Sequence, residues 1–238
     1  MAASWPAPGD VPAFVADARA LGENAADVSF ALAGMTTDER ARFDRFHHDS
    51  DRYMFALGRL MARRLVGRAL GVAPADWAWR EGPHGRPEID RPETDLRFNV
   101  SHSAGLVICA LARGRAVGVD VEDLTRRAPD PAIVPRYFSP AEADDIHAQG
   151  DRWRDRFLTY WTLKEAYLKA RGLGISVALA DISFTLQPDG ARIAFERSLA
   201  GTDDRWTFHL WHPTPRHLAA LAAETGDITP PVFLPQWL

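Results

Sequence analysis

Two carboxylates in the segment VGVDVED have the spacing of a metal site carried on a strand. Residues two apart in a strand project from the same face, about 7 Å from each other, so Asp120 and Glu122 face one side while Val119 and Val121 face the other. Carboxylates held this close repel each other unless they are solvated or share a cation. A solvated strand end explains this pair alone at least as well, because short acidic motifs are common.

The segment YWTLKEAYLKARGLG carries a carboxylate and an ammonium group one helical turn apart. Glu165 and Lys169 could form an ordinary surface pair, worth about 0.2–0.5 kcal/mol to a helix. The helical spacing, however, places Phe157, Trp161 and Leu168 around Glu165. We therefore expect this carboxylate to be partly desolvated or to face a cleft.

The two segments together predict a metal site that receives a phosphate-bearing substrate. A third carboxylate, from Glu165, beside Asp120 and Glu122 would provide oxygen ligands only, and such ligands suit Mg²⁺. Magnesium keeps several waters and favours sites that the phosphates of a ligand complete.

A serine and a histidine in the segment FNVSHSAG suggest a rival chemistry. Ser101, His102 and Asp120 are the residue types of a serine hydrolase, and Ser103 is a second candidate nucleophile. The segment does not fit the G-x-S-x-G turn that exposes a hydrolase nucleophile. Adjacent strand residues also point to opposite faces, which is poor geometry for a proton relay. A hydrolase is therefore the less favoured alternative.

The charge of the chain argues against a general nucleic-acid-binding protein. The 238 residues carry a net charge of −4, and the pI is about 6.1. Arginines nevertheless crowd one N-terminal stretch, which could bind a phosphate ligand or form a solvated helix face. They are Arg40, Arg42, Arg45, Arg52, Arg59, Arg63, Arg64 and Arg68.

Cysteine usage and the apolar runs indicate the compartment. A single cysteine, Cys109, excludes an internal disulfide framework and suits a reducing environment. The first residues lack the pattern of a secretory signal, and the longest apolar run, LVICALA, is far shorter than the roughly 20 residues that span a bilayer. We expect a cytoplasmic protein without membrane association.

The order of elements indicates an α+β fold built of two halves. Two short helices are expected to begin at capping boxes, one at Thr36–Glu39 and one at Ser139–Glu142. Two longer helices are expected to cover residues 51–70 and 152–171. DWAWREGPHGRPEI, LRFNVSHSAGLVICALARGRAVGVDVEDL, ISFTLQPDGARIAFE and RWTFHLW have strand and turn patterns, whereas HLAALAAE could be helix or strand. Each half thus offers helices and then antiparallel strands, which predicts half-domains 1–113 and 114–238.

The motifs, read in order, resemble those of one known family. FNVSHS, GVDVED, YFSPAE and WTLKEAYLKARGLG resemble the motifs of the Sfp-type 4'-phosphopantetheinyl transferases, which activate polyketide and peptide synthetases. GPHGRP, residues 82–87, looks like the G-K-P turn of that family with arginine in place of lysine. The matches span roughly residues 36–186. Each motif is weak by itself, but four or five in the right order are specific.

The resemblance implies a fold, a reaction and its partners. The reaction is a magnesium-dependent transfer of 4'-phosphopantetheine from coenzyme A to a serine of an apo acyl or peptidyl carrier protein, with release of adenosine 3',5'-bisphosphate. The fold is a pseudo-twofold pair of similar α+β half-domains in a monomer, with the active site in the cleft between them. A non-catalytic module that binds coenzyme A or a carrier protein is the alternative.

The resemblance also implies roles for the acidic residues and the lysine. Asp120, Glu122 and Glu165 correspond to the metal ligands of the family, and Asp120 also borders the coenzyme. Lys169 corresponds to the lysine that contacts the pyrophosphate. The expected catalytic residues are Glu165, as ligand, as acceptor of the serine proton or as both, and Lys169.

Four further residues correspond to family positions that contact coenzyme A. Ser101 and His102 match the coenzyme-contacting pair, and Arg86 and Pro87 lie at the turn that borders the nucleotide.

The correspondence is looser in the basic N-terminal stretch. Arg42 falls on a family lysine near the 3'-phosphate, but Glu39 stands where another lysine is usual. Met54 replaces an arginine at the start of the long helix, and the nearby Arg52 is the expected coenzyme contact there. These departures affect the contacts expected for the 3'-phosphate and not the reaction.

Overall fold

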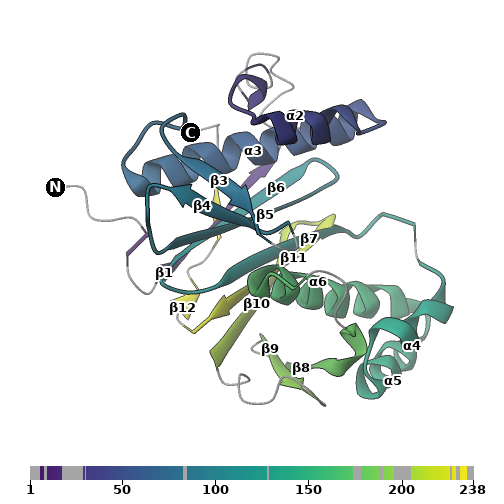
Figure 1. Ribbon diagram of the computed structural model, residues 1–238. Helices are drawn as coiled ribbons and strands as arrows, with labels where there is room; N and C mark the ends of the chain where they lie inside the picture. The colour runs from purple at the N-terminus through teal and green to yellow at the C-terminus, as the bar shows by residue number, and fades with distance from the viewer. Residues whose placement is uncertain are drawn as a thin grey trace.

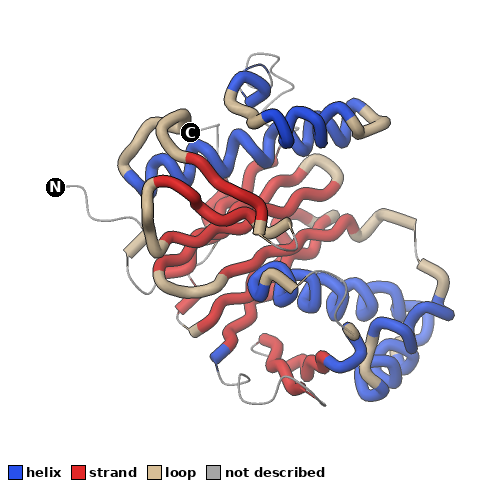
Figure 2. Tube along the Cα trace, viewed as in Figure 1, coloured by secondary structure: helices blue, strands red, loops and turns tan. Residues whose placement is uncertain are grey.

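Strands lie between two long helices in the computed structural model of the protein (Figure 1). Helix α3, Asp49–Leu70, lies on one side of the strands and α6, Trp153–Arg171, on the other, so the helices surround a central block of strands (Figure 2). The structure describes residues 6–7, 10–17, 29, 31–82, 85–127, 129–173, 178–187, 190–195, 205–225, 227–228 and 231–234. In these ranges we find no helix with the length and apolarity to cross a membrane.

The sheet beneath α3 has the strand order β13-β2-β6-β5. Its strands are β2, Ala13–Asp17, β5, Leu96–Ser103, β6, Leu106–Arg113, and β13, Val232–Phe233. Buried side chains of α3, including Leu57 and Leu65, pack against Phe98 of β5 and Leu111 of β6. The short helix α2, Thr37–Asp44, precedes α3, and the hairpin of β3, Ala78–Glu81, and β4, Pro87–Arg91, follows it.

The sheet beneath α6 has the strand order β10-β11-β7. Its strands are β7, Val117–Asp123, β10, Trp206–Thr214, and β11, His217–Glu224. The helices before α6 are η1, Pro131–Ile133, α4, Val134–Tyr137, α5, Pro140–Ala148, and η2, Gly150–Arg152. After α6 come η3, Leu179–Asp181, and the hairpin of β8, Ile182–Gln187, and β9, Gly190–Phe195.

The two halves of the chain repeat one order of elements. In each half a strand is followed by helices, a hairpin and two antiparallel strands, and the strand orders β2-β6-β5 and β7-β11-β10 correspond. The C-terminal strands return to the first sheet, because β13 pairs with β2 and β12, Asp227–Ile228, pairs with β1, Asp10–Val11. The protein therefore has the α+β architecture expected from the sequence.

The two sheets meet where β5 lies beside β7. The Asn99 side chain on β5 accepts a hydrogen bond from the backbone N–H of Val119 on β7, at 3.0 Å. Val119 and Val121 point away from α6 into an apolar cluster that also contains Ile108 of β6 and Leu221 of β11. This packing leaves the opposite face of β7, with Asp120 and Glu122, beneath α6.

The predicted helix boundaries are confirmed by their caps. Thr36 and Ser139 each accept a hydrogen bond from the backbone N–H three residues on, and both capping boxes are complete. Gly71 ends α3 and Gly172 ends α6, both in the left-handed conformation with φ of 71° and 63°.

The segment HLAALAAE, which could be helix or strand from its pattern, is the strand β11. Its side chains are buried on both faces, since Ala220 and Ala222 pack in the cluster around α6 while Ala219 and Leu221 pack between the sheets. A strand buried on both faces loses the alternation that identifies a strand in a sequence.

Helix α6 lies unusually close to β7 because Gly118 has no side chain. A Cβ atom at this position would lie 2.2 Å from the carbonyl oxygen of Ala166 and 2.3 Å from the backbone nitrogen of Ala170. Gly118 and Asp120 share one face of β7, so the glycine brings the helix backbone down next to the aspartate. This close approach positions Glu165 and Lys169 over the acidic face of β7.

Candidate active site

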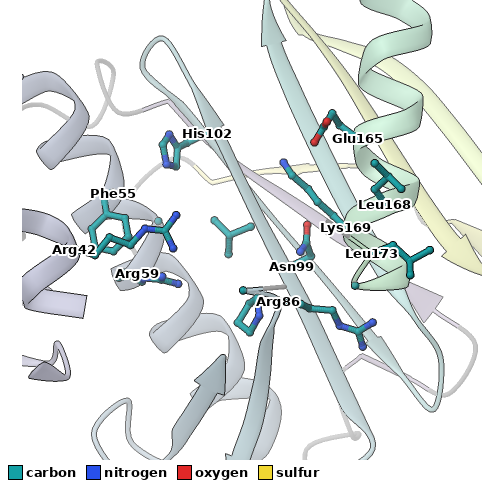
Figure 3. A pocket seen from close by; sticks show the side chains of 15 residues that line it. Arg42, Phe55, Arg59, Arg86, Asn99, His102, Glu165, Leu168, Lys169 and Leu173 are labelled. Atoms are coloured by element: carbon teal, nitrogen blue, oxygen red, sulfur yellow. The ribbon is translucent and has the colours of Figure 1, made fainter. Parts of the chain in front are cut away.

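A cavity of about 450 Å³ lies between the two halves of the protein (Figure 3). Helices α2 and α3 and strand β5 form one wall, and the C-terminal part of α6 forms the other. The residues that line it include Arg42, Phe55, Arg59, Arg86, Asn99, His102, Glu165 and Lys169. Four of these side chains are cationic at neutral pH and only Glu165 is acidic, so the cavity suits an anionic ligand.

Lys169 connects the predicted acidic site to strand β5. Its ammonium nitrogen lies 2.6 Å from Oδ1 of Asp120 and 3.0 Å from Oγ of Ser101. Ser101 Oγ also donates to Oδ1 of Asp120 at 3.1 Å. The three residues come from α6, β7 and β5, so this network joins the two halves at the wall of the cavity.

The Ser101 geometry does not favour the hydrolase alternative. The hydroxyl donates directly to the Asp120 carboxylate and also contacts Lys169, whereas a serine nucleophile needs a general base such as an imidazole within hydrogen-bond reach. His102 faces the cavity from the other side of the strand. Ser101 therefore orients Asp120 and Lys169.

Glu165 and Glu122 lie close enough to Asp120 to feel its charge. Burial raises the pKa of Glu165, and the charges of Asp120 and Glu122 raise it further, while Lys169 lowers it. Burial and the charge of Asp120 likewise raise the pKa of Glu122, which pairs with Arg126 at 2.6 Å. The three carboxylates that the sequence analysis selected, Asp120, Glu122 and Glu165, thus lie near enough to influence one another electrostatically.

The three carboxylates do not form a metal site as they stand, although two of their oxygen atoms remain without a partner in the described part of the chain. Among the described residues, no group of three histidine, cysteine, aspartate or glutamate side chains is close enough to hold an ion as it stands. Lys169 and Arg126 instead occupy Asp120 Oδ1 and Glu122 Oε2. Asp120 Oδ2 and Glu165 Oε1, however, are buried and have no hydrogen-bond partner among the described residues. Oxygen atoms of this kind suit Mg²⁺.

His102 lines the cavity as a neutral imidazole. The surrounding protein desolvates the ring, and the positive charges of Lys169 and Arg59 act in the same direction, which lowers the pKa of His102 to about 4. At neutral pH the ring can therefore accept or donate a hydrogen bond without carrying a charge. A bound anion would favour its protonated form.

Arg86 and Pro87 border the cavity from the N-terminal half. The Arg86 guanidinium donates to the carbonyl oxygen of Ala170 at 2.7 Å, across the boundary between the halves. The contact satisfies a carbonyl at the end of α6 and places a positive charge near the helix C-terminus. Burial lowers the pKa of Arg86.

The residues of the N-terminal stretch that match the family only loosely lie in different surroundings in the structure. Arg42 lines the cavity and lies 3.5 Å from Glu81. Arg52 is not among the cavity-lining residues and pairs with the exposed Asp49 at 3.0 Å. Met54 is buried in the core beneath α3, and Glu39 is a buried capping residue.

Sequence reasoning missed several residues of the cavity wall. Phe55, Arg59 and Asn99 line the cavity, and Asn99 also fixes β5 against β7. Arg59 was recognisable only as one arginine in a basic stretch, with a solvated helix face as the alternative. Its side chain is only 13% exposed, so that alternative is wrong for Arg59.

Two family models match this chain over most of its length. A model described as the 4'-phosphopantetheinyl transferase superfamily matches residues 116–222. A model described as 4'-phosphopantetheinyl transferase, N-terminal, matches residues 23–113. Together the two models cover both long helices, α3 and α6, and the strands β5, β6, β7 and β10.

Individual relatives are similar over 66% to 83% of the chain. The chain is 37% identical over 159 residues to the 4'-phosphopantetheinyl transferase HetI of Nostoc sp., covering 66% of this chain and 67% of that protein. It is 31% identical over 160 residues to a 4'-phosphopantetheinyl transferase of Bacillus subtilis, covering 67% and 70%. It is 33% identical over 215 residues to a phosphopantetheinyl transferase of Thraustochytrium sp., covering 83% and 74%. The chain belongs to the 4'-phosphopantetheinyl transferase superfamily.

Proposed function

We propose that the protein transfers the 4'-phosphopantetheine group of coenzyme A to a serine of an apo acyl or peptidyl carrier protein. The reaction depends on Mg²⁺ and releases adenosine 3',5'-bisphosphate. Membership of the family supports the transfer itself. The observation that carries the proposal is the meeting of Asp120, Glu165 and Lys169 at the wall of a basic cavity between the halves.

The cavity charges match the ligand. Coenzyme A carries a pyrophosphate and a 3'-phosphate, and the lining offers Arg42, Arg59, Arg86 and Lys169 against the single carboxylate of Glu165. Lys169 is placed to neutralise the pyrophosphate, because its ammonium lies at the wall beside Asp120. Positive charge held in place before the reaction stabilises the charge that develops on the leaving phosphate.

Asp120, Glu122 and Glu165 are the residues that would hold Mg²⁺. When bound, Mg²⁺ supplies positive charge that withdraws electron density from the phosphate oxygens. The buried and unpartnered oxygens Asp120 Oδ2 and Glu165 Oε1 support this assignment.

The reaction exchanges one phosphorus–oxygen bond for another. The carrier serine oxygen bonds to the phosphorus atom that bears pantetheine, while the bond from this phosphorus to the bridging oxygen breaks. Adenosine 3',5'-bisphosphate leaves with the electron pair, and Glu165 accepts the serine proton. In the protein without metal, burial and the charges of Asp120 and Glu122 raise the pKa of Glu165, and a bound Mg²⁺ would lower it.

We also propose that residues 1–113 and 114–238 are the two half-domains of a monomer. The repeated strand orders β2-β6-β5 and β7-β11-β10 support this division. The ranges matched by the two family models, 23–113 and 116–222, support it as well. The short strands β12 and β13 are the segment of the second half that returns to the first sheet.

An intact-mass measurement tests the function. An apo carrier protein incubated with coenzyme A and MgCl₂ should gain the mass of one phosphopantetheine group, and the gain should disappear when Mg²⁺ is chelated. Asp120→Asn and Glu165→Gln should each slow the transfer by at least about 100-fold while the proteins stay folded. Transfer at the normal rate by either variant would refute the proposed site. Binding of coenzyme A with no mass gain on any carrier tested would support the non-catalytic alternative.

A further inference from the structure

Arg86 joins the N-terminal half of the protein to the last turn of α6. Its Nη1 atom donates a hydrogen bond to the carbonyl oxygen of Ala170 at 2.7 Å, although the two residues lie 84 positions apart in the chain. The side chain points from the turn before β4 toward the end of α6 that carries Lys169 and Leu173 (Figure 3). The contact therefore crosses the boundary between the halves next to the lysine of the cavity wall.

This contact takes part in the C-terminal cap of α6. The last carbonyl oxygens of a helix have no partner within the helix and need donors from elsewhere. The carbonyl oxygen of Leu168 accepts from the backbone N–H of Leu173 at 3.0 Å, which is the usual solution. The carbonyl oxygen of Ala170 accepts from Arg86 instead, and this cation lies at the negative end of the helix dipole.

Gly172 leaves the space that Arg86 occupies. A Cβ atom at Gly172 would lie 3.1 Å from Cδ of Arg86 and 3.5 Å from its Nη1 atom. Gly172 also ends α6 in the left-handed conformation, with φ of 63°. The glycine that ends the helix thus also lets the arginine lie across the helix end.

Strand β7 holds the same turn of α6. A Cβ atom at Gly118 would lie 2.3 Å from the backbone nitrogen of Ala170 and 2.9 Å from its Cα atom, so strand and helix are in direct backbone contact there. Ala170 is therefore fixed by Gly118 from its own half and by Arg86 from the other half. The position of its neighbour Lys169 depends on both contacts.

Lys169 needs this placement because its two contacts lie in different halves. Its Nζ atom lies 2.6 Å from Oδ1 of Asp120 on β7 and 3.0 Å from Oγ of Ser101 on β5. Both contacts can form only while the end of α6 keeps its position relative to β5. Displacement of a catalytic group by about 1 Å can cost about 100-fold in rate.

The turn that carries Arg86 is itself fixed. The backbone N–H of Gly82 donates to the carbonyl oxygen of Arg86 at 2.8 Å, and that of Gly85 donates to Gly82 at 2.9 Å. An arginine has several N–H donors in one plane, so one donor can bind Ala170 while the rest of the side chain lines the cavity.

We infer that Arg86 is a positioning residue, which acts on the transfer reaction through Lys169 by fixing the last turn of α6 to the N-terminal half. The resemblance to the family implies only that Arg86 borders the nucleotide. The inference rests on the proposed function, because the reaction that Lys169 assists is the transfer of phosphopantetheine. The contact between Arg86 and α6 involves no substrate, so it can be tested without one.

The lysines of the chain allow a direct test by NMR. Lys164 and Lys169 are the only lysines in the sequence, so protein labelled with ¹⁵N at lysine Nζ gives one ammonium signal for each. Lys164 is fully buried and pairs with Glu142, so its signal reports on the fold, whereas the Lys169 signal reports on the site. Arg86→Met should shift the Lys169 signal and speed the exchange of its protons with water by about threefold or more, and should leave Lys164 unchanged. An unchanged Lys169 signal, or equal changes at both lysines, would overturn the inference.

Arg97→Met is the matched control for the loss of a positive charge. Burial lowers the pKa of Arg86 and the charge of Arg97 lowers it further, so the two guanidinium groups lie near each other. Arg97, however, donates to the carbonyl oxygens of Thr94 and Leu96 in its own half. The control variant should leave both lysine signals unchanged. If it moved the Lys169 signal as far as Arg86→Met does, charge and not the contact with α6 would be responsible, and the inference would be wrong.

A double-mutant cycle on the transfer reaction separates positioning from a direct contact with coenzyme A. Arg86→Met should lower the turnover number by about tenfold when Lys169 is present. In the Lys169→Met protein the same change should cost less than about threefold, because the residue that Arg86 positions is already absent. Equal losses in both backgrounds would assign Arg86 a role independent of Lys169 and overturn the inference.

Two further points keep the test decisive. Arg86→Gln, with a shorter polar side chain, repeats both measurements if Arg86→Met lowers the folded fraction. The NMR measurement requires no transfer. If the Lys169 signal responded as expected while the unchanged protein modified no carrier, the proposed function would be refuted and the contact of Arg86 with the end of α6 would stand.

Discussion

The Lys169 ammonium lies 2.6 Å from Oδ1 of Asp120, and this ion pair links α6 to β7 at the wall of the cavity. The contact is possible because Gly118, two residues before Asp120, lets the helix backbone approach the strand. Lys169 also contacts Ser101 from the other half at 3.0 Å. The same lysine therefore neutralises the acidic face of β7 and presents positive charge to the cavity.

Replacing Lys169 with methionine should have opposite effects on metal binding and on turnover. Without its ammonium, Asp120 Oδ1 loses a competing partner, so Mg²⁺ should bind the ligand-free protein more tightly, by about tenfold or more. Turnover should fall by at least about 100-fold, because the charge opposite the pyrophosphate is lost. Calorimetric titration of Mg²⁺ and a transfer assay measure the two effects. Weaker Mg²⁺ binding by the variant would contradict the competition between lysine and metal.

His102 should take up a proton when coenzyme A binds. The pKa of His102 is lowered to about 4 in the free protein, so the ring is neutral at pH 6. A bound phosphate favours the imidazolium and raises this pKa, so binding should strengthen as the pH falls from about 7 toward 5. Titrations at pH 6 in buffers of different ionisation enthalpy measure the uptake.

Two comparisons assign this proton to His102. His102→Gln should show less uptake than the unchanged protein with coenzyme A, and the difference should shrink with 3'-dephospho-coenzyme A if the 3'-phosphate is the group responsible. Equal uptake by the variant and the unchanged protein would mean that another group takes the proton.

Gly118→Ala should damage the fold and the site together. The added Cβ would lie 2.2 Å from the Ala166 carbonyl oxygen, so α6 must move away from β7, at a cost of about 1–3 kcal/mol or more in the free energy of unfolding. The displacement would carry Glu165 and Lys169 away from Asp120, and transfer should fall with stability. Urea unfolding and the transfer assay measure both effects.

Gly58→Ala provides the contrast within a helix. A Cβ at Gly58 would lie at an ordinary contact distance, 3.4 Å from Cγ1 of Val100, and alanine favours the helix by about 1 kcal/mol. This variant should be as stable as the unchanged protein or more stable. Equal destabilisation of both variants would show that the close approach at Gly118 has no special role.

The sequence predicted the local structure because that structure depends on short-range patterns. The capping boxes at Thr36 and Ser139 each act within one helical turn. The faces of a strand and a helix suggested a shared site for Asp120 and Glu165, and the resemblance to the family implied it. Patterns of this kind can be recognised in a single sequence.

Other features could not be predicted because they depend on what lies opposite in space. The arginines of α3 could form a solvated face by their pattern, yet Arg59 and Arg63 are largely buried and both lie over the ring of Trp79 on β3. The strand β11 lost its alternation because both of its faces are covered. The pairing of β13 with β2 joins residues more than 200 positions apart, and two-residue strands leave no periodic signal.

The buried pair of Lys164 and Glu142 is another feature that could not be predicted from the sequence. We expect it to be essential to the stability of the folded protein. Both side chains are fully buried, with 2.7 Å between Lys164 Nζ and Glu142 Oε2. Lys164 also donates to the carbonyl oxygens of Leu179 and Ile182, and Glu142 accepts from the backbone N–H of Phe184 at 2.8 Å. The pair therefore ties α6 to α5 and to the strand β8, directly beside Glu165.

Lys164→Met should cost about 3–5 kcal/mol in the free energy of unfolding, because it leaves the Glu142 carboxylate buried without a counter-charge. The double variant Lys164→Met, Glu142→Gln removes that charge and should be more stable than the single variant. Arg52→Ala, which breaks the exposed pair with Asp49, should cost less than about 1 kcal/mol. Urea unfolding compares the three proteins. If the double variant were no more stable than Lys164→Met, the loss would come from the lysine's carbonyl contacts, and the buried charge of Glu142 would not be what the lysine compensates.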